Sequence, residues 1–464
     1  MELLSFENVL NTVKGQFFPE QFSAQLFMNL EDLSDNYLIY FHERFHYLQN
    51  IFTPYGHVKW GCYRTYTAEI VNIWLHNFNA NKKIPAASYL DTDNFEYLKP
   101  LSEIFLQNMA LQFSTITESN NISEELLKGN KINKDDLTPI IQTQQGDYSL
   151  NGMDIIESHA KFEEALLAYF IENKPLNDTI NPEMLPSRYY IALQYFMENL
   201  SADRILEFPI VCELSLATSH LPLLNDINSL KKNLPSWRFV KIIDYLKENP
   251  DVQFKEISDD NFLNFTNKIL NNCDFDSWDE LWRRAEEYAK NTDLTMAIEM
   301  LEAIKFKKTN PLALSFPFLF LTNEGFNRFH PLFTITGDSI FYNIDHISGS
   351  EMIFENHFQA LSNQICGEIS RRCIYPDMLQ CGYSYFGLKE CQYQKSGLCD
   401  GHINQNSTLP NLKVDDYGNI IEGCDFEAFL NIIGTSFKNI TIGNIDKKIS
   451  MNDLSNAIKK FKNS

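Results

Sequence analysis

Two histidines four residues apart flank a glutamate near the start of the chain, in His42-Glu43-Arg44-Phe45-His46. On an α-helix, residues four apart lie one turn apart on the same face, so both imidazoles can bind one metal ion. Glu43 between them can serve as the base that activates a metal-bound water. The HExxH spacing therefore predicts metal-assisted hydrolysis, most often of peptide bonds, with His42 and His46 as ligands and Glu43 as the catalytic residue.

The surrounding residues predict the helix that this chemistry needs. Ser34 and Asp35 are suited to an N-cap, and the apolar residues that follow recur every three or four positions. We therefore expect a helix over residues 35–50, with His42 and His46 beside its apolar stripe, where the floor of a pocket would lie. The stripe itself consists of Leu38, Phe41, Phe45, Leu48 and Phe52.

Upstream, apolar and polar residues alternate over residues 22–30, which is the pattern of a half-buried strand. A strand that leads into an HExxH helix resembles the architecture of the zincin metallopeptidases, rather than any one protein. In that group an edge strand pairs with an extended substrate through main-chain hydrogen bonds. The resemblance implies a catalytic zinc ion and a peptide or protein substrate.

A catalytic zinc usually has three protein ligands, so a third must come from elsewhere in the chain. The metzincin subclass would have a glycine and a histidine where this chain has Gln49 and Phe52, which argues against that subclass. His57 follows in a segment that contains Pro54 and Gly56, and a lone histidine in such a turn is usually solvated.

A later helical stretch, residues 154–165, resembles the third-ligand helix of the gluzincins. In that group a glutamate binds the zinc, and a small residue three positions later lets the helix approach the HExxH helix. Glu157 and Ala160 have this spacing, so the resemblance implies Glu157 as the third ligand. Glu163 is an alternative carboxylate ligand, and an ordinary solvated acidic face is the competing interpretation of the stretch.

The stretch departs from the gluzincin pattern in two ways. The gap between His46 and Glu157 is longer than usual, so an inserted segment is expected at about residues 91–150. Lys161 also stands where that group often has an acid that orients a ligand histidine. Glu164 or His159 would then take that orienting role.

Hydrolysis also needs a hydrogen-bond donor for the oxyanion of the transition state. Tyr189, Tyr190 and His220 are candidates by their position in the sequence.

Six of the nine cysteines cluster late in the chain, which in a cytosolic protein indicates metal binding before disulfides. No CxxC pair occurs there, so buried free thiols are the competing interpretation, as for Cys62, Cys212 and Cys273. The candidate ligands of a structural zinc ion or an iron–sulfur cluster are Cys373, Cys381, Cys391 and Cys399.

Composition limits the partners and the compartment. A net charge of −22 argues against nucleic acid and anionic membranes as partners. No basic leader and no long apolar stretch is visible, so a cytoplasmic location is expected. A protease inside a cell needs restraint, which makes a regulatory protein partner a further expectation.

The fold class expected for the 464 residues is α+β and mainly helical, in two or three domains. We expect a zincin-like catalytic region over residues 1–225, a helical region over 226–310 and a mixed, cysteine-rich region over 311–464. Amphipathic helices are predicted at 237–246, 261–270, 278–288 and 296–304, a strand at 316–321, a hairpin at 331–343 and a final helix at 452–461.

Two competing hypotheses concern function. One is a non-catalytic helical scaffold that binds a partner protein and keeps a vestigial metal site, although such a protein has no chemical need for Glu43. The other is an iron oxidase with carboxylate ligands, but such sites normally use a second Glu-x-x-His pair that is not visible here.

Overall fold

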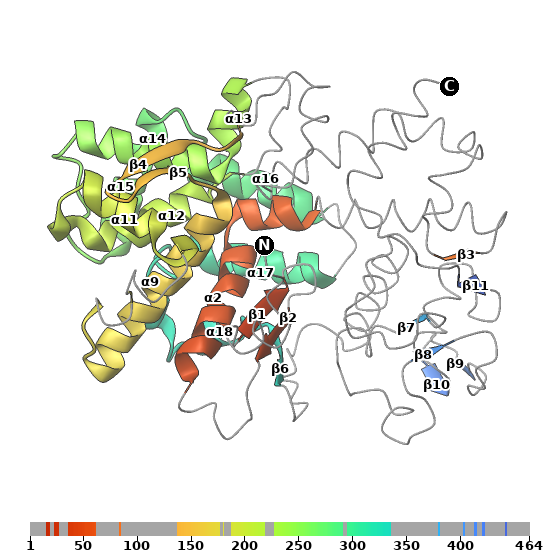
Figure 1. Cartoon of the computed structure of the whole chain (residues 1–464). Coiled ribbons are helices and arrows are strands. Elements are labelled where there is room, and N and C mark those ends of the chain that lie inside the picture. Colours follow the sequence, from red (N-terminus) through yellow and green to blue (C-terminus); the bar gives the residue numbers. More distant parts are fainter. Residues whose placement is uncertain are drawn as a thin grey trace. The chain divides into compact units, whose positions relative to one another are not determined.

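The structure is a computed structural model (Figure 1). It describes residues 15–18, 23–26, 36–61, 83–84, 137–176, 180, 187–218, 227–290 and 295–335, and five short strands between residues 379 and 442. Contacts divide the chain into two compact units, residues 1–61 with 111–346 and residues 62–110 with 347–464. The HExxH motif and Glu157 both belong to the first unit.

Helix α2 (Tyr37–Phe52) carries the HExxH motif and lies within two residues of the predicted range. The predicted stripe faces the core, since Phe41, Phe45, Leu48 and Phe52 are buried. The helix ends where Thr53 adopts an extended backbone, as expected for a residue that precedes a proline. The Thr53 hydroxyl donates to the carbonyl of Gln49 at 2.6 Å, which satisfies one of the last carbonyl groups of the helix.

Beside α2 lies a three-stranded sheet with the order β1 (Gly15–Phe18), β2 (Ser23–Leu26) and β6 (Leu332–Ile335). β2 is antiparallel to β1 and parallel to β6. Ala24 and Leu26 are buried, as expected for the apolar positions of the strand. The strand predicted at the start of 331–343 is confirmed as β6, and the rest of that hairpin lies outside the described residues.

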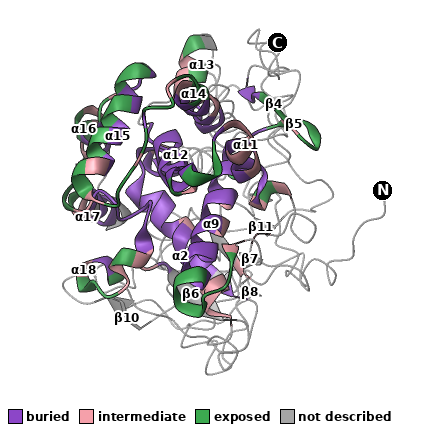
Figure 2. Ribbon diagram, turned by 90° about the vertical axis from the view of Figure 1, so that its left-hand side faces the viewer, coloured by how far each residue is buried: buried purple, intermediate pink, exposed green. Residues whose placement is uncertain are grey.

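Helix α9 (Gly152–Glu172) carries Glu157 and packs directly against α2. A capping box begins it: the Asn151 side chain accepts from the Asp154 amide, and the Asp154 side chain accepts from the Asn151 amide. Both α2 and α9 are buried along much of their length, with helices around them that turn exposed faces outward (Figure 2). Ala160 is fully buried in the cluster that contains Phe45, so a small residue does lie where the two helices meet.

Helices are found at all four positions predicted after residue 230, and each extends beyond the predicted range. They are α14 (Pro235–Glu248), α15 (Asp259–Asn272), α16 (Trp278–Lys290) and α17 (Thr295–Thr309). Other elements in the described part of the first unit are β4 (Ile140–Thr143), β5 (Gly146–Ser149), η4 (Ser187–Tyr189), α11 (Ile191–Asn199), η5 (Ala202–Glu207), α12 (Phe208–Ser215), α13 (Ile227–Asn233), η6 (Pro317–Phe320) and α18 (Glu324–Asn327).

One hydrophobic core crosses the boundary that was expected near residue 225. The rings of Phe208 on α12 and Phe239 on α14 are 6.3 Å apart, and the Arg238 guanidinium donates to the carbonyl of Leu214 at 2.9 Å. The boundary expected near residue 310 is not seen either, because Leu312 and Phe316 are buried in the same core. The structure thus joins residues from the expected regions 1–225 and 226–310, which the sequence suggested were separate.

The strand predicted at 316–321 is wrong. This segment forms the short 3₁₀ helix η6, which begins at Pro317. Proline has no amide hydrogen and cannot donate to a strand ladder, yet it fits the first turn of a helix. The apolar run is explained by burial of Phe316 in the core rather than by a sheet.

The second unit is described only through short strands. β3 (Lys83–Ile84) pairs with β11 (Thr441–Ile442), β7 (Leu379–Gln380) with β8 (His402–Ile403), and β9 (Lys413–Val414) with β10 (Ile420–Glu422). The inserted segment expected at 91–150 is described only from residue 137, where β4 and β5 form a hairpin. The final helix expected at 452–461 lies outside the described residues. Over the described part of the chain the fold is α+β and mainly helical, and it includes no helix long and apolar enough to cross a membrane.

Candidate metal centre

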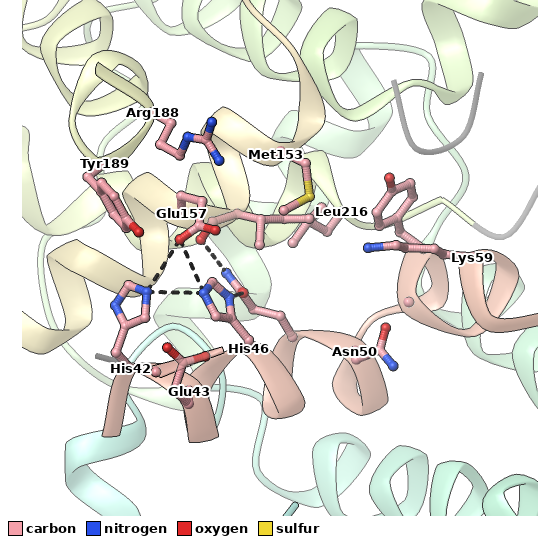
Figure 3. A pocket seen from close by; sticks show the side chains of 15 residues that line it. His42, Glu43, His46, Asn50, Lys59, Met153, Glu157, Arg188, Tyr189 and Leu216 are labelled. Carbon is pink, nitrogen blue, oxygen red and sulfur yellow. Dashed lines mark hydrogen bonds and ion pairs between the residues drawn. The ribbon is translucent and has the colours of Figure 1, made fainter. Parts of the chain in front are cut away.

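His42, His46 and Glu157 point toward one another across the contact between α2 and α9 (Figure 3). The Nε2 atoms of the two histidines are 3.1 Å apart, and Oε2 of Glu157 lies 3.3 Å from Nε2 of His42 and 3.2 Å from Nε2 of His46. Bonds of about 2.0–2.1 Å to a tetrahedral zinc place neighbouring ligand atoms about 3.3 Å apart. The three atoms therefore have the spacing of three tetrahedral zinc ligands.

Hydrogen bonds orient His46 for this role. Nδ1 of His46 lies 2.9 Å from Oε1 of Gln49, while Nε2 of Gln49 donates to the carbonyl of Ile156 at 3.0 Å. The Gln49 amide thus presents its oxygen to the imidazole, which must carry its proton on Nδ1. The lone pair on Nε2 then faces Glu157, and the same Gln49 side chain ties α2 to α9.

His42 has a carboxylate on its other nitrogen. Nδ1 of His42 is 3.3 Å from Oε2 of Glu164, and Nζ of Lys161 donates to Oε1 of the same carboxylate at 2.5 Å. Carboxylates in this position hold the ring and make a ligand histidine more basic. Glu164, one of the two residues expected to orient a ligand, therefore lies beside His42, with Lys161 as its partner.

The charges of the cluster fit a cation. If each histidine carries its proton on Nδ1, the Nε2 atoms of both rings and Oε2 of Glu157 face one another as three acceptors with no hydrogen between them. This arrangement is unfavourable unless a positive charge lies among the three atoms. Burial disfavours a charged imidazole, yet contacts with Glu157 and Glu164 raise the pKa of His42 to about 10. Burial would also raise the pKa of Glu157, but the two histidines lower it below its usual range. A proton or a metal ion is thus favoured at this place, and the donor set matches zinc.

A cavity of about 320 Å³ opens beside the cluster, and His42, His46, Glu157 and Glu43 line it. The side chain of Glu43 is buried, with 6% of the residue exposed. Burial raises the pKa of the Glu43 carboxyl, against the opposing charges of His42 and His46. A carboxylate with a raised pKa takes up and releases a proton nearer to neutral pH, as a general base and acid must.

Arg188 and Tyr189 line the same cavity from the short helix η4. The Ser158 hydroxyl donates to the Arg188 carbonyl at 3.0 Å, which anchors η4 to α9 one residue after Glu157. The Tyr189 ring lies 5.9 Å from the ring of His42, and its hydroxyl points toward the cluster in Figure 3. Burial and nearby carboxylates raise the pKa of Tyr189 to about 12, so the hydroxyl keeps its hydrogen at neutral pH.

The structure separates the other candidates from the cluster. Tyr190 begins α11, is buried and does not line the cavity, whereas its neighbour Tyr189 does. His159 is buried on another face of α9, with its ring 4.7 Å from that of Phe45, so it does not orient a ligand. Glu163 faces His159 in the core and is not in the ligand group.

Three further assignments concern residues outside the cluster. The expectation that His57 lies in a solvated turn is wrong: residues 54–61 are helical, and His57 is buried with Nε2 2.6 Å from the carbonyl of Ile51. Cys212 and Cys273 are buried free thiols, as predicted. Cys62, His220 and the candidate ligands Cys373, Cys381, Cys391 and Cys399 lie outside the described residues, so their roles stay predictions.

Two residues that position the site were not singled out from the sequence. Gln49 was expected on the helix face that carries His42 and His46, but no orienting role was assigned to it, although its place one turn after His46 could have suggested one. Gly15 lines the cavity from strand β1, and no signal in the sequence pointed to it.

No protein-family model matches the chain, and comparisons with curated proteins and with solved structures found no match.

A second buried polar group lies behind the cluster, and we expect it to limit stability. Glu163 is buried, and among the described residues neither of its carboxylate oxygens has a hydrogen-bond partner; Nε2 of His159 is 3.9 Å away. Burial, together with the charge of Glu213, raises the pKa of Glu163 well above its usual value. An acid whose pKa is raised on folding lowers the free energy of unfolding as the pH rises from the unfolded pKa of about 4.3 toward the folded pKa. The loss is about 1.4 kcal/mol per pH unit.

We therefore expect Glu163→Gln to raise the free energy of unfolding by about 1–3 kcal/mol at pH 7, with the gain vanishing toward pH 4. Urea unfolding of both proteins between pH 4 and pH 8 measures this difference. A variant less stable than wild type at pH 7 would show instead that an ionised Glu163 is stabilised by His159.

Proposed function

We propose that the protein is a zinc-dependent metallopeptidase of the zincin type, similar to the gluzincins, with His42, His46 and Glu157 as ligands. The observation that carries this proposal is the triangle of two imidazole nitrogens and one carboxylate oxygen, with edges of 3.1, 3.2 and 3.3 Å. Glu43 lines the same cavity, so ligands and base are available to one substrate. Zinc would supply Lewis acidity, which polarises a carbonyl group and acidifies water.

The roles of the chain's own residues follow from their surroundings. Glu43 accepts a proton from the attacking water and delivers it to the leaving amine, because its carboxyl lies at the cavity and its pKa is raised. Tyr189 donates its hydroxyl hydrogen to the developing oxyanion, a role suited to a buried phenol that stays protonated. Gln49 holds the His46 imidazole through a hydrogen bond, and the Glu164 carboxylate lies 3.3 Å from Nδ1 of His42.

An extended peptide is the substrate that best suits the surroundings of the cavity. Within the described sheet β1 is an edge strand that pairs with β2 alone, and its first residue, Gly15, lines the cavity. A peptide laid along the free edge of β1 can form main-chain hydrogen bonds and bring a peptide bond to Glu43. Strand addition of this kind favours peptides over small esters or sugars.

The proposal is tested with an unbiased mixture of synthetic peptides analysed by mass spectrometry. We expect cleavage by the zinc-loaded protein, loss of cleavage after treatment with a chelator, and recovery when zinc is restored. A zinc-loaded protein that cleaves no peptide in the mixture would contradict the proposal.

A further inference from the structure

Strand β1 approaches Glu43 more closely than a side chain would allow. A Cβ atom placed on Gly15 would lie 2.7 Å from Oε1 of Glu43, 2.8 Å from Cγ and 3.0 Å from Cδ. Non-bonded carbon atoms normally lie about 3.5–4.0 Å apart. Among the amino acids, glycine alone therefore fits at position 15 while Glu43 keeps its place.

The sheet fixes β1 in this position. Gly15 is opposite Leu26 on β2, and residues opposite each other in an antiparallel pair carry their side chains on the same face. Leu26 is fully buried, and both strands contact α2. β2 is held on its other side by β6, so the strand that carries Gly15 has little freedom to move away.

A methyl group at position 15 would therefore displace Glu43 and leave the strand in place. The atoms that it would meet belong to the Glu43 side chain, and rotation about the bonds of that side chain can relieve the contact. His42 and His46 lie on the same helix but are not among the atoms nearest to this methyl group. Glycine at position 15 thus controls the place of Glu43, whose side chain supplies the three atoms nearest to an added methyl group.

We propose that Gly15 is a positioning residue: its backbone, which carries no Cβ atom, packs against the Glu43 side chain and keeps the Glu43 carboxylate beside the metal centre. The contact itself is independent of the activity, whereas its importance for catalysis rests on the proposed function. A shift of about 1 Å in a catalytic group can cost about 100-fold in rate. A methyl group at position 15 would impose a displacement of that order.

A double-mutant cycle in thermal unfolding tests the contact without any need for activity. Gly15→Ala should lower the unfolding temperature while Glu43 is present, because the methyl group and the carboxylate compete for space. In the Glu43→Ala background the space is free, and the same change should leave the unfolding temperature unaltered or raise it, since alanine has less unfolded-state entropy to lose. Equal shifts in the two backgrounds would overturn the proposal.

Kinetics then test the positioning role. On a quenched fluorescent peptide that the wild type cleaves, Gly15→Ala should lower kcat about tenfold or more, with KM within about twofold and an unchanged zinc content. Gly325→Ala in α18 is the matched control, because Gly325 does not line the cavity and its Cβ would come no closer than 3.1 Å to another atom, Oδ1 of Asn323. We expect this control to keep kcat.

The two experiments separate the two proposals. A Gly15→Ala variant that keeps full kcat would overturn the positioning role, even if the unfolding temperatures are coupled. A wild type that cleaves no peptide would defeat the proposed function, while the unfolding cycle would still support or overturn the contact between Gly15 and Glu43.

Discussion

Glu43→Gln is expected to lower kcat about 10²–10⁴-fold while the zinc content stays that of the wild type. The amide has nearly the size of the carboxylate and fills the same space against Gly15, but it cannot accept a proton. Glu43 is absent from the ligand group, so the change should leave His42, His46 and Glu157 in place. Initial rates on a cleaved peptide, measured beside elemental analysis of the same samples, give both quantities.

Glu163→Gln is the matched control for this prediction. It makes the same change at another buried glutamate, six residues after Glu157 and outside the cavity lining. We expect it to keep kcat and to alter only stability. A Glu43→Gln variant that retains most of the wild-type rate would show that the proton is moved by another group and that Glu43 is not the base.

The parts of the site that follow a local pattern could be predicted from the sequence. The HExxH helix was predicted to within two residues, because an apolar period of 3.6 is a property of neighbouring residues. The same pattern placed His42 and His46 on one face. Glu157 came from resemblance to a known helix rather than from spacing, and the structure brings it within 3.3 Å of both histidines.

The parts that depend on contacts distant in the sequence could not be predicted. The approach of Gly15 to Glu43 depends on the packing of β1 and β2 against α2, and Gly15 and Glu43 are 28 residues apart in the chain. Tyr189 and Tyr190 are adjacent, and the choice between them is made where the 3₁₀ helix η4 gives way to α11. Residues at a junction between two kinds of helix follow no single hydrophobic period. The sequence therefore does not predict which way their side chains point.

The domain boundaries were missed for a related reason. Turn residues between amphipathic helices suggested separate regions, but amphipathic faces must be buried against something. Contacts of α17 cross the expected boundary: Tyr47 on α2 donates to Glu299 at 2.9 Å, and Met300 packs in the cluster that holds Phe45. The back of the HExxH helix is thus covered by a helix that the sequence placed in another region.

His46→Ala is expected to remove about one zinc ion per chain and the stability that the zinc provides. A ligand whose free concentration is a thousand times its Kd raises the free energy of unfolding by about 4 kcal/mol. The variant should gain almost none of this stabilisation from added zinc. Elemental analysis and urea unfolding, each with and without added zinc, measure the two effects. The quantity compared is the zinc content of the wild type minus that of the variant. Any metal ion bound by the late cysteines is present in both proteins and cancels.

Two variants sharpen the interpretation of this result. Glu164→Gln weakens the carboxylate that holds His42 and should lower zinc affinity only about 10–100-fold, less than the loss of a ligand. His159→Leu removes a buried histidine of α9 that has no hydrogen-bond partner among the described residues, and it should keep the zinc. If His46→Ala held as much zinc as the wild type, the triangle of His42, His46 and Glu157 would not be a metal site. The HExxH motif would then be a structural part of a helical scaffold, because its closely placed acceptors would have to share a proton instead of a cation.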